Sequence, residues 1–120
     1  MSVSVYRVQA GDGRGPWRPG WSHTWIEVDA PADRLTETMM DLLPIDVLMH
    51  LPPGMAYGSA CRTLDALLCW FLPPERERLA RFGFHPVRLN LDVVLAESQW
   101  QLIIGRRRPF ADGATRLRWR

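Results

Sequence analysis

Three separate segments of the chain carry side chains that could bind a ligand or catalyse a reaction: Arg7, Tyr57 with Ser59, and Glu97 with Gln101. A guanidinium can hold a phosphate, an aromatic ring can stack on a planar base, and a carboxylate can stabilise developing positive charge. The run from Glu97 to Gly105 leads from polar residues directly into an apolar segment typical of a β-strand. Such a run predicts functional groups on a rigid strand at the mouth of a cleft.

Several other kinds of site are excluded or weakly indicated. All 15 basic residues are arginine, and a chain without lysine cannot form a Walker-type phosphate loop. The glycines between Gly11 and Gly15 have the wrong spacing for a dinucleotide fingerprint, and Pro16 follows instead of a helix. We interpret this segment as a structural turn rather than a phosphate-binding loop.

The cysteines and histidines do not predict a metal site or a disulfide framework. Cys61 and Cys69 are too far apart for a CxxC pair, and we expect both to be buried small apolar residues. No histidine has a second ligand at metal-binding spacing.

The hydrophobic patterns predict one α+β domain over residues 1–120, with an N-terminal strand, helices in the middle and mostly antiparallel C-terminal strands. Thr63 is the expected N-cap of the clearest helix, and Gly83 is the expected C-cap of the next one. Residues 24–28 fit a short strand or the entry to a helix equally well. The expected strands are 2–9, 55–60, 84–91, 93–95, 99–106 and 115–120, and the expected helices are 32–43, 44–50, 63–72 and 75–82.

The order of the three candidate segments resembles the ADP-ribosyltransferase superfamily. That family takes an Arg or His from its first strand, a Ser or aromatic residue from its second and a Glu from its fifth. The resemblance is clearest from Gln99 to Ile104, which is similar to the family's Glu/Gln-x-Glu run into an apolar strand. A basic turn and a phenylalanine follow, here Gly105 to Phe110.

The resemblance implies NAD as substrate and a role for each residue. Arg7 would hold a phosphate or ribose, Tyr57 would stack on nicotinamide and Ser59 would orient it. Gln101 stands where the family has its catalytic Glu, and a neutral amide cannot stabilise an oxocarbenium-like ribose. Glu97 could supply the charge if the chain turns between Glu97 and Gln99.

Each of these residues also has a structural interpretation. Arg7 could be a surface cation paired with an acid. Tyr57 and Ser59 could serve packing and capping, and Glu97 with Ser98 could form a turn. Trp17, Trp21 and Trp25 recur beside arginines, as in proteins that bind nucleotides or single-stranded nucleic acid.

A second resemblance, to small phage and prophage proteins, rests on residues 13–20 and 95–98. It suggests an origin and leaves the mechanism open. The alternative function is a non-catalytic protein of phage or prophage origin that binds a host protein or, less favoured, nucleic acid through its basic, Trp- and Arg-rich surface. Residues 1–60 carry four Arg and seven acids, whereas residues 61–120 carry eleven Arg and six acids. The second half therefore favours phosphate-bearing ligands. No apolar run is long enough to span a membrane and no secretory signal is recognisable, so we expect a cytoplasmic protein.

Overall fold

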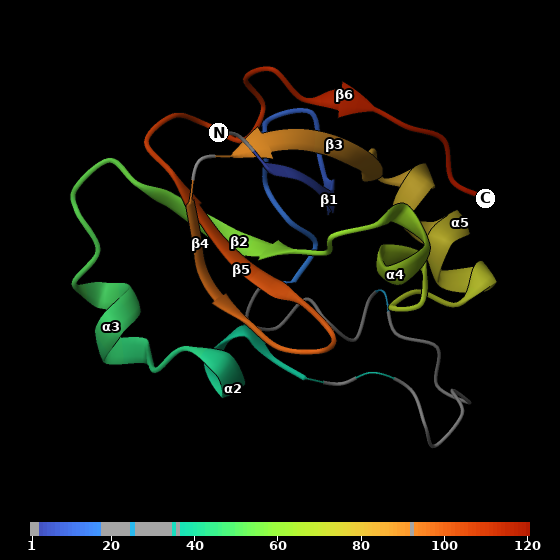
Figure 1. Cartoon of the computed structure of the whole chain (residues 1–120). Coiled ribbons are helices and arrows are strands. Elements are labelled where there is room, and N and C mark those ends of the chain that lie inside the picture. Colours follow the sequence, from blue (N-terminus) through green and yellow to red (C-terminus); the bar gives the residue numbers. More distant parts are fainter. Residues whose placement is uncertain (1–2, 18–24, 26–34, 36, 92) are drawn as a thin grey trace.

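A computed structural model shows an α+β fold with two antiparallel three-stranded sheets (Figure 1). The structure describes residues 3–17, 25, 35, 37–91 and 93–120. One sheet has the strand order β1-β3-β6 and the other has the order β2-β5-β4. The strands are β1 (Val3–Gln9), β2 (Ala56–Ala60), β3 (His85–Leu91), β4 (Val93–Glu97), β5 (Leu102–Arg106) and β6 (Thr115–Arg116).

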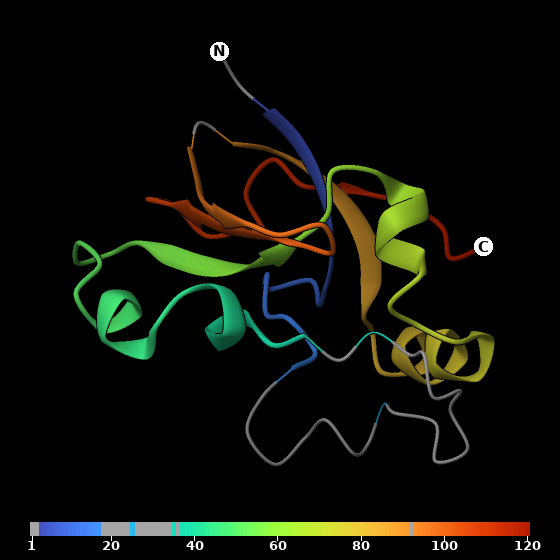
Figure 2. The ribbon, with the colours of Figure 1, turned by 60° about the horizontal axis from the view of Figure 1, so that its bottom comes forward.

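One backbone bridge joins the two sheets. The amide of Tyr6 donates to the carbonyl oxygen of Cys61 at 2.8 Å, and the amide of Cys61 donates to that of Tyr6 at 2.7 Å. Since Cys61 directly follows β2, the strands run across the molecule in the order β4-β5-β2-β1-β3-β6. Figure 2 shows the two sheets turned steeply away from each other on either side of this bridge.

Strand β1 is central because both of its faces are covered. Val5 points into an apolar core between the sheets, formed with Leu89, Ile104 and other apolar residues. Val8 belongs to a second core, where Leu67 and Leu79 pack against the opposite face of β1. The alternation of side chains along a strand therefore divides the molecule into two apolar layers.

Four helices are described: α2 (Met39–Leu42), α3 (Ile45–Met49), α4 (Leu64–Leu68) and α5 (Pro73–Arg81). Helices α4 and α5 lie beside the β1-β3-β6 sheet, whereas α2 and α3 lie along the β2-β5-β4 sheet (Figure 2). The expected N-cap is confirmed, since Thr63 Oγ1 accepts from the Ala66 amide at 3.0 Å. The C-cap of α5 is Phe82 rather than Gly83, which follows it with a φ of 85°. Among the residues that the structure describes, no helix is long and apolar enough to cross a membrane.

Several predicted boundaries were wrong. Of the helix expected over residues 32–43, residues 35, 37 and 38 are not helical, because extended Thr38 caps the helix and its amide donates to Asp41 Oδ2 at 2.7 Å. Helix α4 ends at Leu68, β5 begins at Leu102 rather than at residue 99, and β6 has two residues. The segment 24–28 lies outside the described residues, apart from Trp25.

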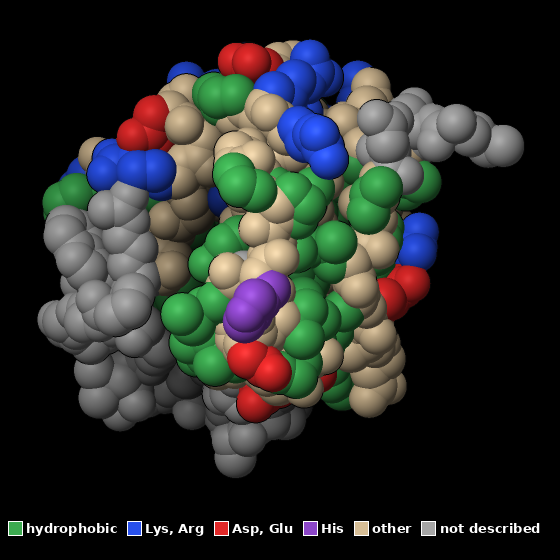
Figure 3. Space-filling model, turned by 90° about the vertical axis from the view of Figure 1, so that its left-hand side faces the viewer, with side chains coloured by type: hydrophobic (Ala, Val, Ile, Leu, Met, Phe, Trp, Pro, Cys, Tyr) green, Lys and Arg blue, Asp and Glu red, His purple; other side chains and the backbone are tan. Residues whose placement is uncertain are grey.

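The face that carries α3 has apolar side chains in contact with solvent (Figure 3). Exposed apolar residues over α2, α3 and the adjoining sheet are Met40, Ile45, Val47, Met49, Tyr57 and Val93. Contiguous apolar surface of this kind commonly marks a site of interaction with another protein. The alternative function expected from the sequence uses a different surface, one that is basic and rich in Trp and Arg.

Candidate functional site

Arg7 is buried between the sheets, with 5 % of its surface exposed. Its Nε donates to Gln9 Oε1 at 2.9 Å, its Nη1 to the Ser59 carbonyl oxygen at 3.3 Å, and its Nη2 to the Gly13 carbonyl oxygen at 3.2 Å. These acceptors are neutral, so the interpretation of Arg7 as a surface cation paired with an acid is wrong. Burial, together with the nearby charge of Arg106, lowers the pKa of Arg7 to about 10, which leaves the guanidinium charged at neutral pH.

Gly58 and Phe110 form the pocket that holds this guanidinium. A Cβ atom on Gly58 would overlap Nη1 of Arg7, so the close approach of the side chain requires glycine at this position. The Arg7 Cζ lies 4.5 Å from the centroid of the Phe110 ring, and the Arg106 Cζ lies 5.7 Å from the same centroid. One aromatic ring thus interacts with two cations.

Ser59 and Tyr57 lie on β2, beside β5. Ser59 pairs with Ile103 and Tyr57 pairs with Gly105. Because successive side chains of a strand point to opposite faces, Tyr57 and Ser59 point away from the face on which Gly58 meets Arg7. The structure therefore brings Arg7 to the backbone of Ser59 and separates it from the Tyr57 ring, which is 44 % exposed.

Gln101 is buried directly before β5 and contacts a carboxylate. Its Nε2 donates to Glu37 Oε1 at 3.0 Å, and Ser98 Oγ donates to the same oxygen at 2.6 Å. The Gln101 Nε2 also lies 3.3 Å from the Glu37 carbonyl oxygen and 3.4 Å from that of Thr38. The amide at the start of β5 thus holds a carboxylate that comes from the segment before α2.

Glu97 is in a different environment. The chain turns at residues 98–101, and Glu97 lies at the end of β4 in an exposed, two-pronged ion pair with Arg62. The Arg62 Nε lies 2.6 Å from Oε2 and its Nη2 lies 2.7 Å from Oε1. Hydrogen bonds from Arg62 lower the pKa of Glu97, so this carboxylate is ionised and already paired with a cation.

The turn between β4 and β5 is fixed against the bridge between the sheets. The carbonyl oxygen of Trp100 accepts from Trp70 Nε1 at 3.2 Å and from Cys61 Sγ at 3.6 Å. We call the region of this bridge, with the strand ends and the turn beside it, the strand junction. It comprises Arg7, Ser59, Cys61, Gln101 and Glu37.

The two cysteines differ, and the prediction that both are buried was wrong for Cys69. Cys69 is exposed, whereas Cys61 is buried and its pKa is raised to about 12 by removal from water. The described residues hold no group of three or more His, Cys, Asp or Glu side chains that could bind a metal.

Trp17 and Trp25, two of the three tryptophans expected to line a nucleic-acid groove, pack against other aromatic rings. Trp25 is buried, and its Nε1 donates to the Pro16 carbonyl oxygen at 2.8 Å. Trp17 stacks on Phe71, with ring centroids 5.7 Å apart. Trp21 lies outside the described residues. Trp17 and Trp25 are thus used in packing.

Sequence reasoning missed Glu37. The helical spacing of Leu35, Met39 and Leu42 placed Glu37 within a helix, on its polar face. The signal that could have corrected this is Thr38 followed three residues later by Asp41, since such a pair marks a helix start. Residues before an N-cap are not helical and are free to reach another element.

No protein-family model, no curated protein and no solved structure matches this chain.

Proposed function

We propose that this chain is a small ADP-ribosyltransferase-like domain that binds NAD or a related nucleotide at the strand junction and hydrolyses it. The observation that carries the proposal is the adjacency of β1, β2 and β5. The resemblance takes functional residues from the first, second and fifth strands, and these three strands are neighbours in the order β5-β2-β1. The strands that carry Arg7, Tyr57 and Ser59 are therefore neighbours, with β5 beside them.

Arg7 supplies the positive charge for the nucleotide phosphates. The three hydrogen bonds to Gln9, Ser59 and Gly13 use three of the five N–H donors of a guanidinium. Its described partners are all neutral and leave its charge uncompensated. In a site of low dielectric constant such a charge attracts an anion more strongly than it would in water. Arg7 also positions Ser59 by binding its carbonyl oxygen.

Glu37 supplies the carboxylate that the amide of Gln101 cannot provide. Ser98 and Gln101 hold it through two neutral donors, so its charge remains available to a ligand, whereas the charge of Glu97 is paired with Arg62. Gln101 on this proposal is a positioning residue. Fixed groups that face developing charge are a major source of rate enhancement in enzymes.

The proposed reaction is hydrolysis of the bond between nicotinamide and ribose. The carbon–nitrogen bond breaks, and its electron pair leaves with nicotinamide, which becomes neutral. The ribose becomes oxocarbenium-like, and Glu37 stabilises it through the 2'-hydroxyl. Water then adds to the ribose carbon and releases a proton, which gives ADP-ribose.

Release of nicotinamide from NAD, measured by chromatography, tests this assignment. We expect Glu37→Gln to lower the rate at least about 100-fold. Glu77→Gln is the matched control, because Glu77 is an exposed helical residue paired with Arg81, and it should retain the wild-type rate. Loss of activity in Glu97→Gln but not in Glu37→Gln would transfer the role to Glu97. Absence of nicotinamide release from the wild-type protein would overturn the proposed hydrolysis.

A further inference from the structure

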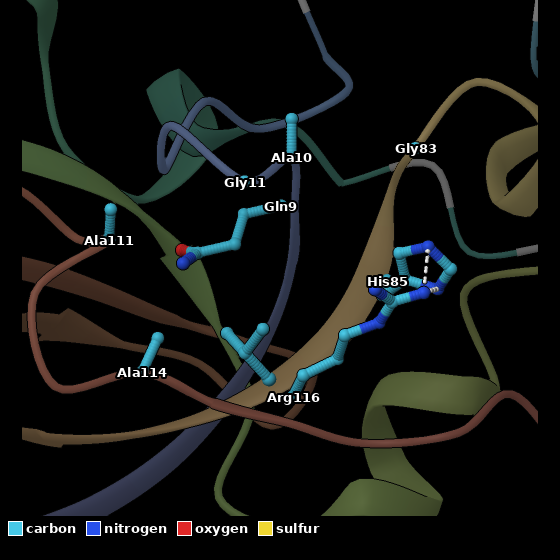
Figure 4. Close-up of a pocket in the computed structure, with 9 residues that line it drawn as sticks. Gln9, Ala10, Gly11, Gly83, His85, Ala111, Ala114 and Arg116 are labelled. Carbon is cyan, nitrogen blue, oxygen red and sulfur yellow. Dashed lines mark hydrogen bonds between the residues drawn. The ribbon is translucent and has the colours of Figure 1, made fainter.

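A cavity of about 270 Å³ opens at the edge of the β1-β3-β6 sheet where β1 ends (Figure 4). It lies where β1 ends, β3 begins and β6 runs alongside, and Ala111 and Ala114 close one side. Gln9 and His85 are paired across β1 and β3, and Arg116 is paired with Val87. Three adjacent strands thus present polar side chains to one space.

The described lining of this cavity carries positive charge and includes no Asp or Glu. Arg116 Nη2 lies 2.8 Å from His85 Nε2 and 3.4 Å from its Nδ1, and Figure 4 shows the two side chains directed at each other. Burial, together with the charge of Arg116, lowers the pKa of His85 and favours the neutral imidazole. The pair therefore consists of a cation, Arg116, and a side chain, His85, that becomes a second cation when it is protonated.

Gln9 adds a fixed neutral donor. Its Oε1 accepts from Arg7, and its Nε2 donates to the Phe110 carbonyl oxygen at 2.9 Å. An amide nitrogen has two hydrogens, so one N–H of Gln9 has no partner among the described residues. The bond from Arg7 polarises this amide and strengthens it as a donor.

The size of the cavity limits its ligand. Pockets that hold drug-sized molecules measure about 300–1,000 Å³, so a dinucleotide would not fit here. A phosphate group with a few further atoms would fit. The net charge also favours phosphate over carboxylate, because a dianion can compensate both Arg116 and a protonated His85, whereas a carboxylate is compensated by Arg116 alone.

We propose that this cavity binds a small phosphate monoester through Arg116, His85 and Gln9. The lining residues of this cavity differ from the strand-junction residues, although Gln9 accepts a hydrogen bond from Arg7, and the proposal does not depend on the function proposed above. Arg116 donates to the phosphate oxygens, Gln9 donates its remaining N–H, and His85 binds as an imidazolium after taking a proton from water or from the monoanionic ester. The Arg116 to His85 hydrogen bond is replaced by bonds to the ligand.

Titration of the wild-type protein with inorganic phosphate, followed by NMR of the His85 ring protons, tests the proposal. We expect saturable changes and an increase in the pKa of His85 on binding. Arg116→Gln should weaken binding at least tenfold. Arg118→Gln, an exposed arginine two residues further on that does not line the cavity, should bind as the wild type does.

Three results would overturn the proposal: no response to phosphate, equal binding by Arg116→Gln, or equally tight binding of acetate, which lacks the second charge. His85→Gln gives an independent check if Arg116→Gln is poorly folded. This variant keeps a neutral donor but cannot become cationic, so we expect weaker binding of phosphate and an unchanged amide spectrum outside the cavity. Unweakened binding by His85→Gln would also contradict the proposal.

Discussion

The guanidinium of Arg7 on β1 donates a hydrogen bond to the backbone oxygen of Ser59 on β2, with Nη1 and O 3.3 Å apart. This contact crosses the region where the two sheets diverge beyond the bridge between Tyr6 and Cys61. It therefore couples a buried charge to the strand that carries two of the predicted ligand-binding residues. The stability of this region should depend on the side chain at position 7.

Arg7→Met should lower the free energy of unfolding by about 2 kcal/mol, because it leaves three buried acceptors without their donor. Urea denaturation followed by circular dichroism measures the change. Arg88→Met is the control, because Arg88 is exposed on the neighbouring β3 and should change stability by less than about 0.5 kcal/mol. Equal effects of the two substitutions would contradict the account of Arg7.

Gly58→Ala should lower stability by about 1–3 kcal/mol, since the added methyl group overlaps the Arg7 side chain in a closely packed region. Gly11→Ala is the matched control, because no atom lies within 4 Å of a Cβ built at Gly11 and the added methyl group meets no neighbour. Thermal melts of both variants give the comparison. A neutral Gly58→Ala would mean that Arg7 moves aside without loss of its hydrogen bonds.

Cys69 should react with iodoacetamide in the native protein at pH 8, whereas Cys61 should react only after unfolding. Cys69 is exposed, and burial raises the pKa of Cys61 to about 12, so little of the reactive thiolate forms. Mass spectrometry of peptides from the labelled protein distinguishes the two sites. Preferential labelling of Cys61 would contradict the description of the bridge region.

His85 should make the protein less stable as the pH falls below about 6.5. Its folded-state pKa is lowered, so the unfolded chain binds more protons in this range, and stability is lost as the pH falls through 6.5 toward the folded-state value. In His85→Gln this part of the pH dependence should disappear. Denaturation curves between pH 5 and pH 8 measure it, and identical slopes for both proteins would contradict the assignment.

Strands β1 and β3 were predictable from the sequence because apolar side chains alternate along them toward a buried face. The alternation of Val3 and Val5 identified β1, and the same alternation places Arg7 on the inward side. The N-cap Thr63 and the glycine just after the C-cap of α5, Gly83, were predictable because a cap needs a side-chain acceptor and a positive φ favours glycine. The α+β class followed from the order of these elements.

The contacts at the strand junction were not predictable, because they join residues that are distant in the sequence. The approach of Glu37 to Gln101 depends on where α2 begins, and the pairing of Glu97 with Arg62 depends on how the β4–β5 turn meets the end of β2. The approach of His85 to Arg116 depends on the position of a two-residue strand. The hydrophobic periodicity of one segment does not indicate which residues of distant segments contact it.

Titration of NAD into the purified protein, followed by melting temperature and tryptophan fluorescence, tests the central claim most directly. At a free NAD concentration of 100 times the dissociation constant, binding should add about 2.7 kcal/mol of stability. We predict a saturable rise in melting temperature for the wild type and an equal rise for Arg88→Met. If neither signal changes up to about 10 mM NAD, ten times the upper end of usual KM values, the proposed nucleotide site at the strand junction is contradicted.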